Sequence, residues 1–270
     1  MLDCMKNTEE SANAPAVGGP MIAFEHVSIA FNDRPVLEDV SFSVERGETL
    51  CILGRSGVGK SVSLRLLMGF LKPDSGSIQV DGQLVSSMRE EGLRQLRKRV
   101  TMVFQNGALF DSLSVRENVA FPLRELGDKT EEQIQAEADR LIRLVGAEDS
   151  IDALPASLST GRKRAVAIAR ALAANPEVVL YDEPTTMVDP IIARRMGDLI
   201  EQLRQQTGIT CIVVTHDMRF ARRLADRILF LDQGHAHYFG PLQGFLELQD
   251  PITRKFLDLD DYRLPLAPAH

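Results

Sequence analysis

Residues 54–61 read GRSGVGKS, and this short stretch decides the fold of the 270-residue chain. It fits the pattern G-x-x-x-x-G-K-[ST], in which glycines let backbone N–H groups close around phosphate oxygens. The apolar run TLCIL at 49–53 precedes it, and the helix-like stretch KSVSLRLLMGFL at 60–71 follows it. The N-terminus of such a helix favours negative charge. A chance glycine-rich turn is the plain alternative, but this strand-then-helix context favours a P-loop.

The P-loop is predicted to bind a nucleotide through its phosphates. Lys60 would contact the β- and γ-phosphates, and the Ser61 hydroxyl would bind Mg²⁺. The predicted ATP-binding residues of the loop are Gly54, Arg55, Ser56, Gly57, Val58, Gly59, Lys60 and Ser61.

An acidic pair follows the apolar run VVLY at 178–181. Asp182 would hold Mg²⁺ beside the P-loop, as a Walker B aspartate does. Glu183 would polarise the attacking water as a general base. The alternative is a solvated acidic pair at a strand end, which the presence of the P-loop disfavours.

Two further polar residues follow strand-like segments. Gln105 ends the stretch VTMVFQ, and His216 ends the stretch TCIVVTH. A polar residue at the carboxyl end of a parallel strand points into the ligand crevice of an α/β sheet. Either residue alone would be an ordinary loop residue, but their places relative to the other motifs predict that they belong to the same site.

Strand-like patterns open and close the chain. Residues 22–54 are mostly strand-like, and VSFSV at 40–44 alternates apolar and polar residues. Short apolar runs return in VVLYDE, TCIVVTH and RILFLDQG, separated by helical stretches. This alternation predicts an α/β fold with a parallel sheet covered on both faces.

The middle of the chain has a helical pattern. Residues 129–147 have apolar residues at helical spacing, a capping box formed by Thr130 and Gln133, and a stop at Gly146. We therefore expect a helical subdomain at about 106–160.

The composition disfavours several classes of protein. The net charge is −7, and nucleic-acid phosphates require a basic face, so we expect no nucleic-acid partner. Cys4, Cys51 and Cys211 lack metal-ligand spacing. The last two lie in apolar runs and are expected to be small buried hydrophobes in a reducing cytosol. The chain shows no secretory signal and no stretch approaching the roughly 20 apolar residues of a membrane span. Any membrane role would therefore work through a separate partner.

Taken together, these motifs resemble the ATP-binding subunit of an ABC transporter. The P-loop, Gln105, the signature position LSTGR at 158–162, YDEP, TTMVDP and His216 occur in the order and approximate spacing of that family. The resemblance implies a P-loop NTPase fold with a mainly parallel core sheet, an N-terminal antiparallel β subdomain and an inserted helical subdomain. It also implies ATP and Mg²⁺ as cofactors. We expect the ATPase domain at 21–241 and a C-terminal extension at 242–270, and the composition of residues 1–20 predicts a disordered tail.

The resemblance assigns roles residue by residue. Glu183 would be the catalytic base, His216 would contact the γ-phosphate, and Gln105 would sense Mg²⁺ and the attacking water. The residues implied to hold Mg²⁺ are Ser61, Gln105 and Asp182.

Other roles implied by the resemblance lie at the edges of the site. Phe31 would stack on adenine, and Asp189 would lie in the D-loop that links two sites across a dimer. The family hydrolyses ATP only as a dimer, so a homodimer is implied. The signature residues that would face the ATP of the opposite subunit are Ser159, Thr160, Gly161 and Arg162.

A narrower resemblance is to the ATPases of Mce-type lipid transporters, the group that includes the Mla phospholipid system. It is carried by 54–76, by MVFQNGALFDSLSVRENVAFPLRE at 102–125, most tellingly by its part from 107 to 125, and by LYDEPTT at 180–186. The second stretch lies where the ATPase would grip its permease. This resemblance implies phospholipid transport through an integral-membrane permease, with an Mce-type substrate-binding protein as a further partner. The chain would then be cytoplasmic and peripheral on the cytoplasmic face of the inner membrane.

Two motifs depart from the family pattern. Thr160 stands where the family usually has Gly, and Arg162 stands where it often has Gln. A Thr at a position needing positive φ would cost about 1–2 kcal/mol. Arg162 could reach the nucleotide of the opposite subunit as an arginine finger or could simply be solvated, and the sequence leaves both open. Met187 and Val188 stand where the family usually has Gly-Leu.

Arg162 begins an RKR cluster in the first turn of a helix, where cations oppose the helix dipole. For the other two members, Lys163 and Arg164, a solvated basic patch is the favoured interpretation.

Three further interpretations compete with a lipid-transport motor. A regulatory nucleotide-binding subunit with low turnover is kept open by the altered signature, and the ATPase of a transporter for a non-lipid substrate is the other transport alternative. A DNA-repair or chromosome-organising ATPase is disfavoured by the short insertion without cysteines and by the acidic charge.

The C-terminal extension leaves two alternatives open. It could wrap the neighbouring subunit of a dimer, or it could form a short helix packed on its own subunit. The apolar residues available for either role are Phe256, Leu257, Leu259 and Tyr262.

Overall fold

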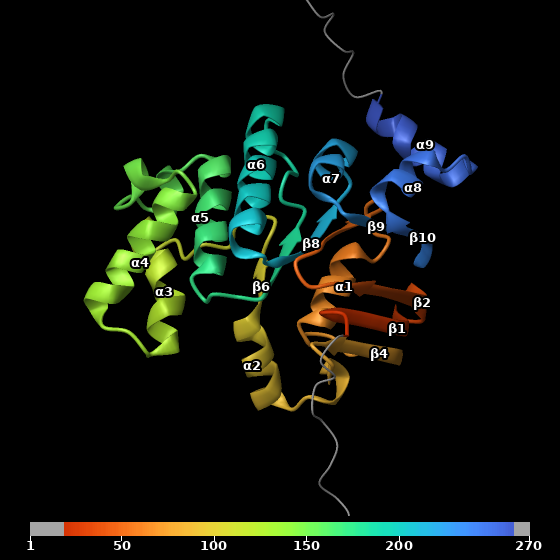
Figure 1. Ribbon diagram of the computed structural model, residues 1–270, viewed down its shortest axis with the longest axis horizontal. Helices are drawn as coiled ribbons and strands as arrows, with labels where there is room; N and C mark the ends of the chain where they lie inside the picture. Colours follow the sequence, from red (N-terminus) through yellow and green to blue (C-terminus); the bar gives the residue numbers. More distant parts are fainter. Residues whose placement is uncertain (1–18, 262–270) are drawn as a thin grey trace, which may run out of the picture.

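Two β-sheets of different kinds organise the structure, a computed structural model that describes residues 19–261 (Figure 1). The first is antiparallel, with strand order β2-β1-β4-β5. Its strands are β1 (Ile22–Phe31), β2 (Arg34–Val44), β4 (Ser75–Val80) and β5 (Gln83–Leu84).

The second sheet has the order β10-β9-β3-β8-β7-β6, and it is parallel except for β10, which runs antiparallel to β9. Its strands are β3 (Thr49–Leu53), β6 (Val100–Val103), β7 (Val178–Asp182), β8 (Thr210–Thr215), β9 (Arg227–Asp232) and β10 (His235–Pro241). The predicted combination of an antiparallel N-terminal sheet with a mainly parallel core sheet is confirmed.

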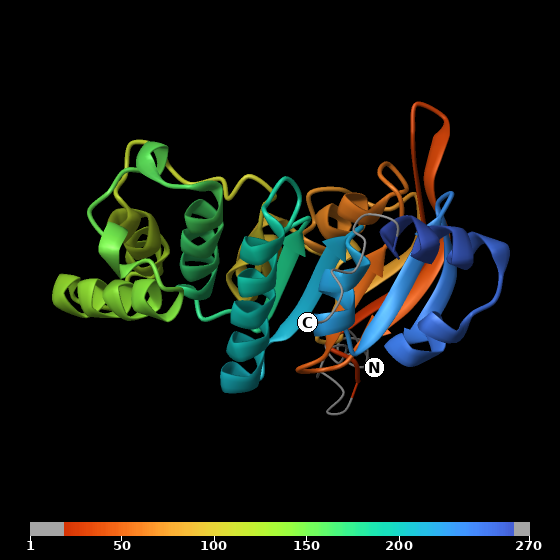
Figure 2. The ribbon, with the colours of Figure 1, turned by 90° about the horizontal axis from the view of Figure 1, so that it is seen from above.

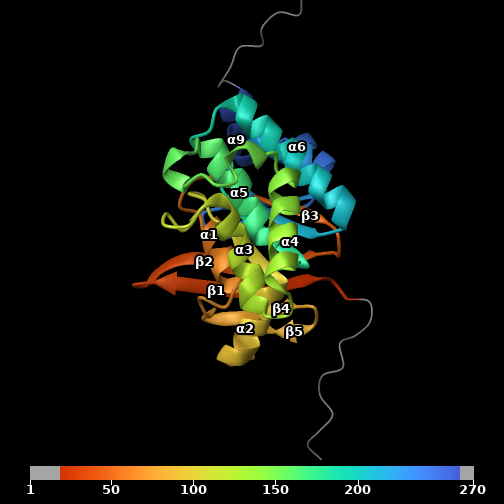
Figure 3. The same cartoon turned by 90° about the vertical axis from the view of Figure 1, so that its left-hand side faces the viewer.

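The central strand β3 shows why the core sheet is covered on both faces. All of its residues are buried. Leu50 and Ile52 join the apolar core of the antiparallel sheet and α1 (Lys60–Leu67), while Cys51 and Leu53 join the core of α6 (Pro190–Thr207) and α7 (Met218–Leu224). Because alternate side chains of a strand point to opposite faces, a continuous apolar run is what a doubly covered strand requires. Figure 3 shows the antiparallel sheet on one side of this layer and α6 on the other.

Three helices project from one end of the core sheet: α3 (Val115–Leu126), α4 (Glu131–Leu144) and α5 (Thr160–Leu172) (Figure 2). The predicted capping box is present, because the Thr130 hydroxyl accepts from Gln133 N and the Gln133 side chain accepts from Thr130 N. Gly146 follows α4 with φ of +66°, which ends the helix. Helix α5 packs against both α3 and α4, so the helical segment includes all of α5, from Thr160 to Leu172. The remaining helical elements before β10 are α2 (Glu90–Arg99) and the 3-10 turns Val85–Ser87, Glu148–Ser150 and Pro155–Ser157.

The described part of the C-terminal extension packs on its own chain. It forms α8 (Leu242–Glu247) and α9 (Pro251–Asp261), and Phe245 and Leu257 are buried against the core. The side chain of Leu259, the residue Tyr262 and the predicted tail up to residue 18 lie outside the part of the chain that the structure describes. Among the helices of residues 19–261, none combines the length and apolar character needed to cross a membrane.

Candidate active site

The P-loop joins the carboxyl end of β3 to the N-terminus of α1, as its sequence context predicts. Gly54 and Gly59 have φ of +150° and +101°. A Cβ at position 54 would lie 2.5 Å from the Leu231 carbonyl oxygen, and a Cβ at position 59 would lie 2.8 Å from the Val36 carbonyl oxygen. Only glycine fits at these two positions, so the loop can bend tightly around a ligand.

Lys60 lies at the base of this loop with only 5% of its side chain exposed. Its ammonium donates to the carbonyl oxygens of Gly54 at 2.8 Å and Arg55 at 3.0 Å, and it lies 3.3 Å from Glu183 Oε1. A buried cation is held where it has anionic or carbonyl partners. The Lys60 ammonium therefore stands between the P-loop and the end of β7, where it could contact phosphate.

Ser61 and Asp182 meet at the ends of α1 and β7. Ser61 Oγ donates to Asp182 Oδ1 at 2.7 Å. Burial raises the pKa of the Asp182 carboxyl, and the hydrogen bond from Ser61 and the charges of Arg65 and Lys60 only partly oppose that rise. A hydroxyl and a carboxylate side by side are hard oxygen ligands, and Mg²⁺ characteristically takes one or two such protein ligands together with substrate phosphates. The residues present therefore fit a Mg²⁺–nucleotide complex.

Glu183 follows β7 in a strained backbone conformation, with φ of +49°. A left-handed conformation costs a non-glycine residue about 1–2 kcal/mol, and such strain is concentrated at functional sites. Glu183 Oε2 lies 2.8 Å from His216 Nδ1 and accepts a hydrogen bond from Thr186 Oγ1 at 3.0 Å. Burial alone would raise the pKa of Glu183, but the hydrogen bond with His216 and the charge of Lys60 outweigh burial and lower it. The carboxylate form is favoured, which suits a general base.

One cleft of about 650 Å³ brings Lys60, Ser61, Glu183, Thr186 and His216 together, and Asp182 is hydrogen-bonded to Ser61 at its edge. The strands β3, β8, β7 and β6 are consecutive in the sheet, so the residues after their carboxyl ends share one edge. Gln105, which follows β6 by two residues, therefore lines the same cleft as His216. The lining residues are Val36, Arg55, Ser56, Gly57, Gly59, Lys60, Ser61, Val62, Gln105, Glu183, Thr186, His216 and Phe256.

Two aromatic residues differ from expectation at this cleft. Phe31, which was predicted to stack on adenine, lies at the end of β1, is 41% exposed and does not line the cleft. The residue of the antiparallel sheet that does line the cleft is Val36 of β2. Phe256 of α9 does line the cleft, and sequence reasoning did not connect it to the site. No local pattern could have done so, because the contact joins two segments that are far apart in the chain.

The signature and D-loop residues lie outside the cleft of their own chain. Ser159 caps α5, with its hydroxyl accepting from Arg162 N at 3.4 Å, and Asp189 caps α6, with its carboxylate accepting from Ile191 N at 2.8 Å. Thr160 is the first residue of α5 and has no positive φ, so the strain that a positive φ would have caused does not arise there.

Close packing explains the retained glycine of the signature. A Cβ at Gly161 would lie 2.6 Å from Ile192 Cγ2, so this position needs glycine to let α5 approach α6. Arg162 turns back into its own helical segment: Nη1 donates to Ser150 Oγ at 2.8 Å and Nη2 lies 3.6 Å from Asp149 Oδ2.

Arg164 is not part of a solvated basic patch, so that prediction was wrong. Its side chain is buried, and its guanidinium donates to the carbonyl oxygens of Pro184 and Thr186 in the loop after Glu183. Burial lowers the pKa of Arg164. The sequence signal that could have revealed this burial is the spacing of four residues between Arg164 and Ile168, which puts Arg164 on the buried face of α5.

A P-loop beside a strand-end Asp–Glu pair and a histidine defines a nucleotide hydrolase of the P-loop class. Residues 37–186 match the family described as ABC transporter. The chain therefore belongs to the ABC transporter family of ATP-binding proteins.

Relatives of known role are similar in sequence to most of this chain. The methionine import ATP-binding protein MetN of Brucella abortus is 39% identical over 252 residues, covering 93% of this chain and 68% of that protein. MetN of Caulobacter vibrioides is also 39% identical over 252 residues, covering 92% of this chain and 76% of that protein.

Solved structures agree with the fold. The cbiO1 subunit of the cbiONQ ABC transporter complex from Clostridium perfringens has a TM-score of 0.79 and 30% identity, covering 91% of this chain and 96% of that one. A dimeric ATP-binding cassette in a post-hydrolysis state with ADP and Pi has a TM-score of 0.75 and 30% identity, covering 82% of this chain and 99% of that one. The predicted ABC ATPase fold is confirmed.

ABC cassettes hydrolyse ATP in a reaction coupled to transport, and this chain is an ATP-binding ATPase of that kind. The narrower resemblance to Mce and Mla lipid ATPases finds no support in these relatives, which are named as methionine importers.

Proposed function

We propose that two copies of this chain form the ATP-hydrolysing motor of an ABC transporter and drive a separate integral-membrane permease from the cytoplasmic face of the inner membrane. The observation that carries the proposal is the cleft that brings Lys60, Ser61, Glu183 and His216 together, with Asp182 hydrogen-bonded to Ser61 beside it. These groups suit binding of the nucleotide phosphates and activation of water at the terminal phosphate.

Each side chain has a part in this chemistry. Mg²⁺ would be held by Ser61, Asp182 and Gln105, and when bound it neutralises the charge that develops on the phosphates. Glu183, kept as a carboxylate by His216 and Lys60, orients the attacking water and takes its proton. Lys60 meets the β- and γ-phosphates as a positive charge that is already desolvated.

A dimer supplies the other half of the site. Ser159 and Thr160 are exposed at the N-terminus of α5 and lie outside the cleft of their own chain. A helix N-terminus favours anions, so the signature of one copy would complete the ATP site of the other. The dimeric cassette with ADP and Pi supports this arrangement by similarity.

The permease would bind beside an exposed aromatic pair. Phe110 and Phe121 are 44% and 38% exposed, and their ring centroids lie 4.9 Å apart. Buried Asn118 fixes the segment, since its side chain accepts from Phe110 N at 2.8 Å and donates to Leu113 O at 2.9 Å. Arg170 donates to Ala108 O at 2.8 Å. Exposed apolar surface on a rigid support is typical of a protein interface.

For the cargo, we propose a small solute rather than a lipid, because the similar proteins in Brucella and Caulobacter are named for methionine import. A phospholipid is the second candidate. The specific observation favouring it is the stretch at 107–125, which forms the aromatic surface described above and resembles Mce and Mla ATPases.

Two experiments test these proposals. Purified protein should hydrolyse ATP, and turnover no higher than that of Glu183→Gln would instead favour the regulatory subunit of low turnover. Tagged Glu183→Gln protein with ATP should also capture its partners from gently solubilised membranes. A permease with a solute-binding protein specific for an amino acid supports the first cargo, whereas an Mce-type protein with bound phospholipid supports the second. Absence of any membrane partner would contradict both.

A further inference from the structure

The C-terminal extension reaches the nucleotide cleft of its own chain. Phe256 of α9 is one of the residues that line the cleft beside Arg55 of the P-loop. A second hollow of about 270 Å³ shares Arg55 and Phe256 with the first and lies between α9 and the end of β9. Phe256 and Arg55 therefore lie between the two hollows. We propose that Phe256 supplies part of the wall that holds the nucleoside portion of ATP, so that α9 belongs to the nucleotide site.

The ring is held in place from behind. Its centroid lies 4.9 Å from that of Phe230 in β9, and Leu257 and Thr253 on the same helix are buried. Phe256 is only half-buried by these contacts, so part of its ring is left to face the cleft. A wall of this kind loses little side-chain entropy when a ligand binds.

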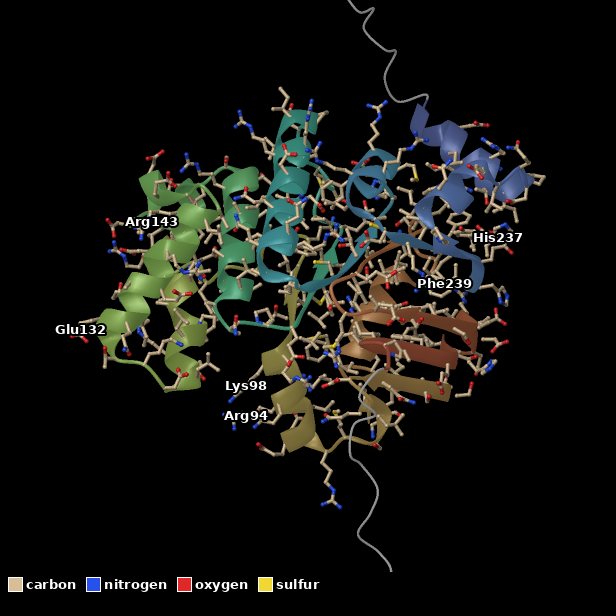
Figure 4. All side chains as sticks on the ribbon, in the orientation of Figure 1. Arg94, Lys98, Glu132, Arg143, His237 and Phe239 are labelled. Carbon is tan, nitrogen blue, oxygen red and sulfur yellow. The ribbon has the colours of Figure 1, made fainter. Side chains whose placement is uncertain are left out.

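The start of α9 is also fixed. Asp250 accepts from the backbone N of Thr253 at 3.0 Å, which caps the helix, and lies 2.9 Å from His237 Nε2 in β10. Figure 4 shows His237 beside the C-terminal helices. The extension is thus tied to the core sheet at the point where it approaches the P-loop.

The lining of the cleft has a polar part and an apolar part. Lys60, Ser61, Glu183 and His216 are polar and suit phosphates and Mg²⁺. The apolar side chains of the lining are those of Val36, Val62 and Phe256. A phosphate gains nothing from an aromatic ring, whereas every nucleobase has a face that stacks on one. The base and ribose are therefore the parts of ATP that Phe256 fits.

The test measures binding without turnover, so it needs no transporter partner. In the Glu183→Gln background, titration calorimetry compares ATP with inorganic tripolyphosphate, which has no base or ribose. Phe256→Leu keeps apolar packing on Phe230 but removes the ring. It should weaken ATP binding about fivefold or more, the loss expected for one base–aromatic contact, and leave tripolyphosphate unchanged. Phe256→Tyr, which keeps the ring, should retain the affinity for ATP.

Ile252 provides the matched control, because it lies on the same helix and lines only the outer hollow. Ile252→Ala should bind both ligands as the parent does, and unfolding midpoints without nucleotide should show that all variants fold. Equal affinity of Phe256→Leu and parent for ATP, or equal losses for ATP and tripolyphosphate, would overturn the proposal. The inference rests on ATP binding by the proposed motor. A parent that binds ATP but never hydrolyses it would overturn the motor and leave this inference standing.

Discussion

His216 Nδ1 lies 2.8 Å from Glu183 Oε2, at the carboxyl ends of the neighbouring strands β8 and β7. Sheet pairing thus fixes the spacing between a candidate base and the imidazole that supports it. Thr186 and Lys60 complete the surroundings of the carboxylate. These contacts lower the pKa of Glu183 in spite of its burial. The base is therefore ionised over a wider range of pH than burial alone would allow.

The first prediction concerns the pH profile of turnover. In His216→Ala the hydrogen bond that lowers the pKa of Glu183 is lost, so that pKa should rise. Since the carboxylate is the active form, the acidic limb of the rate profile should move to higher pH. The maximal rate should fall about 100-fold or more, as when a catalytic proton-transfer group is disturbed. ATPase rates measured from acidic to neutral pH test both changes.

His216→Asn is the control for this prediction, since its amide can occupy the place of Nδ1 and donate to Glu183. The acidic limb should then stay close to that of the parent. An unchanged limb in His216→Ala would show that the imidazole does not set the ionisation of the base.

The second prediction separates the two interpretations of Arg162. Its guanidinium is engaged by Ser150 and Asp149 in its own helical segment. Arg162→Ala should therefore lower kcat by less than about tenfold, whereas loss of an arginine finger costs about 10³–10⁵-fold. Steady-state ATPase kinetics of the dimer distinguish these two interpretations of Arg162. A loss of about a thousandfold in a variant of normal stability would mean that the side chain leaves Ser150 and serves the opposite subunit.

The third prediction contrasts the two departures from the family pattern. Met187 is 92% exposed and has φ of +59°, so Met187→Gly should relieve strain and raise the unfolding free energy by about 1 kcal/mol. Thr160 has an ordinary helical backbone, so Thr160→Gly should give no gain and a loss of up to about 0.5 kcal/mol. Urea unfolding measures both. Met187→Ala, which keeps the strained backbone, is the control, and an equal gain in that variant would contradict the strain argument.

The sequence was informative wherever local chemistry determines local structure. The glycines of the P-loop, the capping box of Thr130 and Gln133, and the apolar run of β3 each carry their own physical reason for the element they form. The parallel order of the core strands then brings Gln105, Glu183 and His216 to one edge.

Other features depend on contacts between distant segments and have no local signature. The place of Phe256 at the cleft depends on how the C-terminal helices dock on β9, and the position of Phe31 depends on how the first hairpin lies relative to the P-loop. A buried arginine such as Arg164 looks like a surface cation until its partners are known, because those partners are backbone carbonyls.

The last prediction follows from Arg164. Its guanidinium binds the carbonyl oxygens of Pro184 and Thr186, so it connects the signature helix α5 to the loop that carries Glu183 and Met187. Arg164→Gln should leave at least one of these carbonyls unpaired and destabilise the fold by about 1–3 kcal/mol. Turnover should fall as well, because the loop that orients Glu183 loses its anchor.

Two further variants make this test more specific. Arg164→Lys keeps the charge but lacks the planar fork that reaches both carbonyls, so its stability and turnover should lie between those of the parent and Arg164→Gln. Lys163→Gln changes the adjacent cation and should behave as the parent, because no hydrogen bond of its side chain is found within residues 19–261. If Arg164→Gln kept full stability while turnover fell, the guanidinium would act on the reaction and not as an anchor of the loop. If it kept both, the link between α5 and the loop after Glu183 would have to run through other contacts.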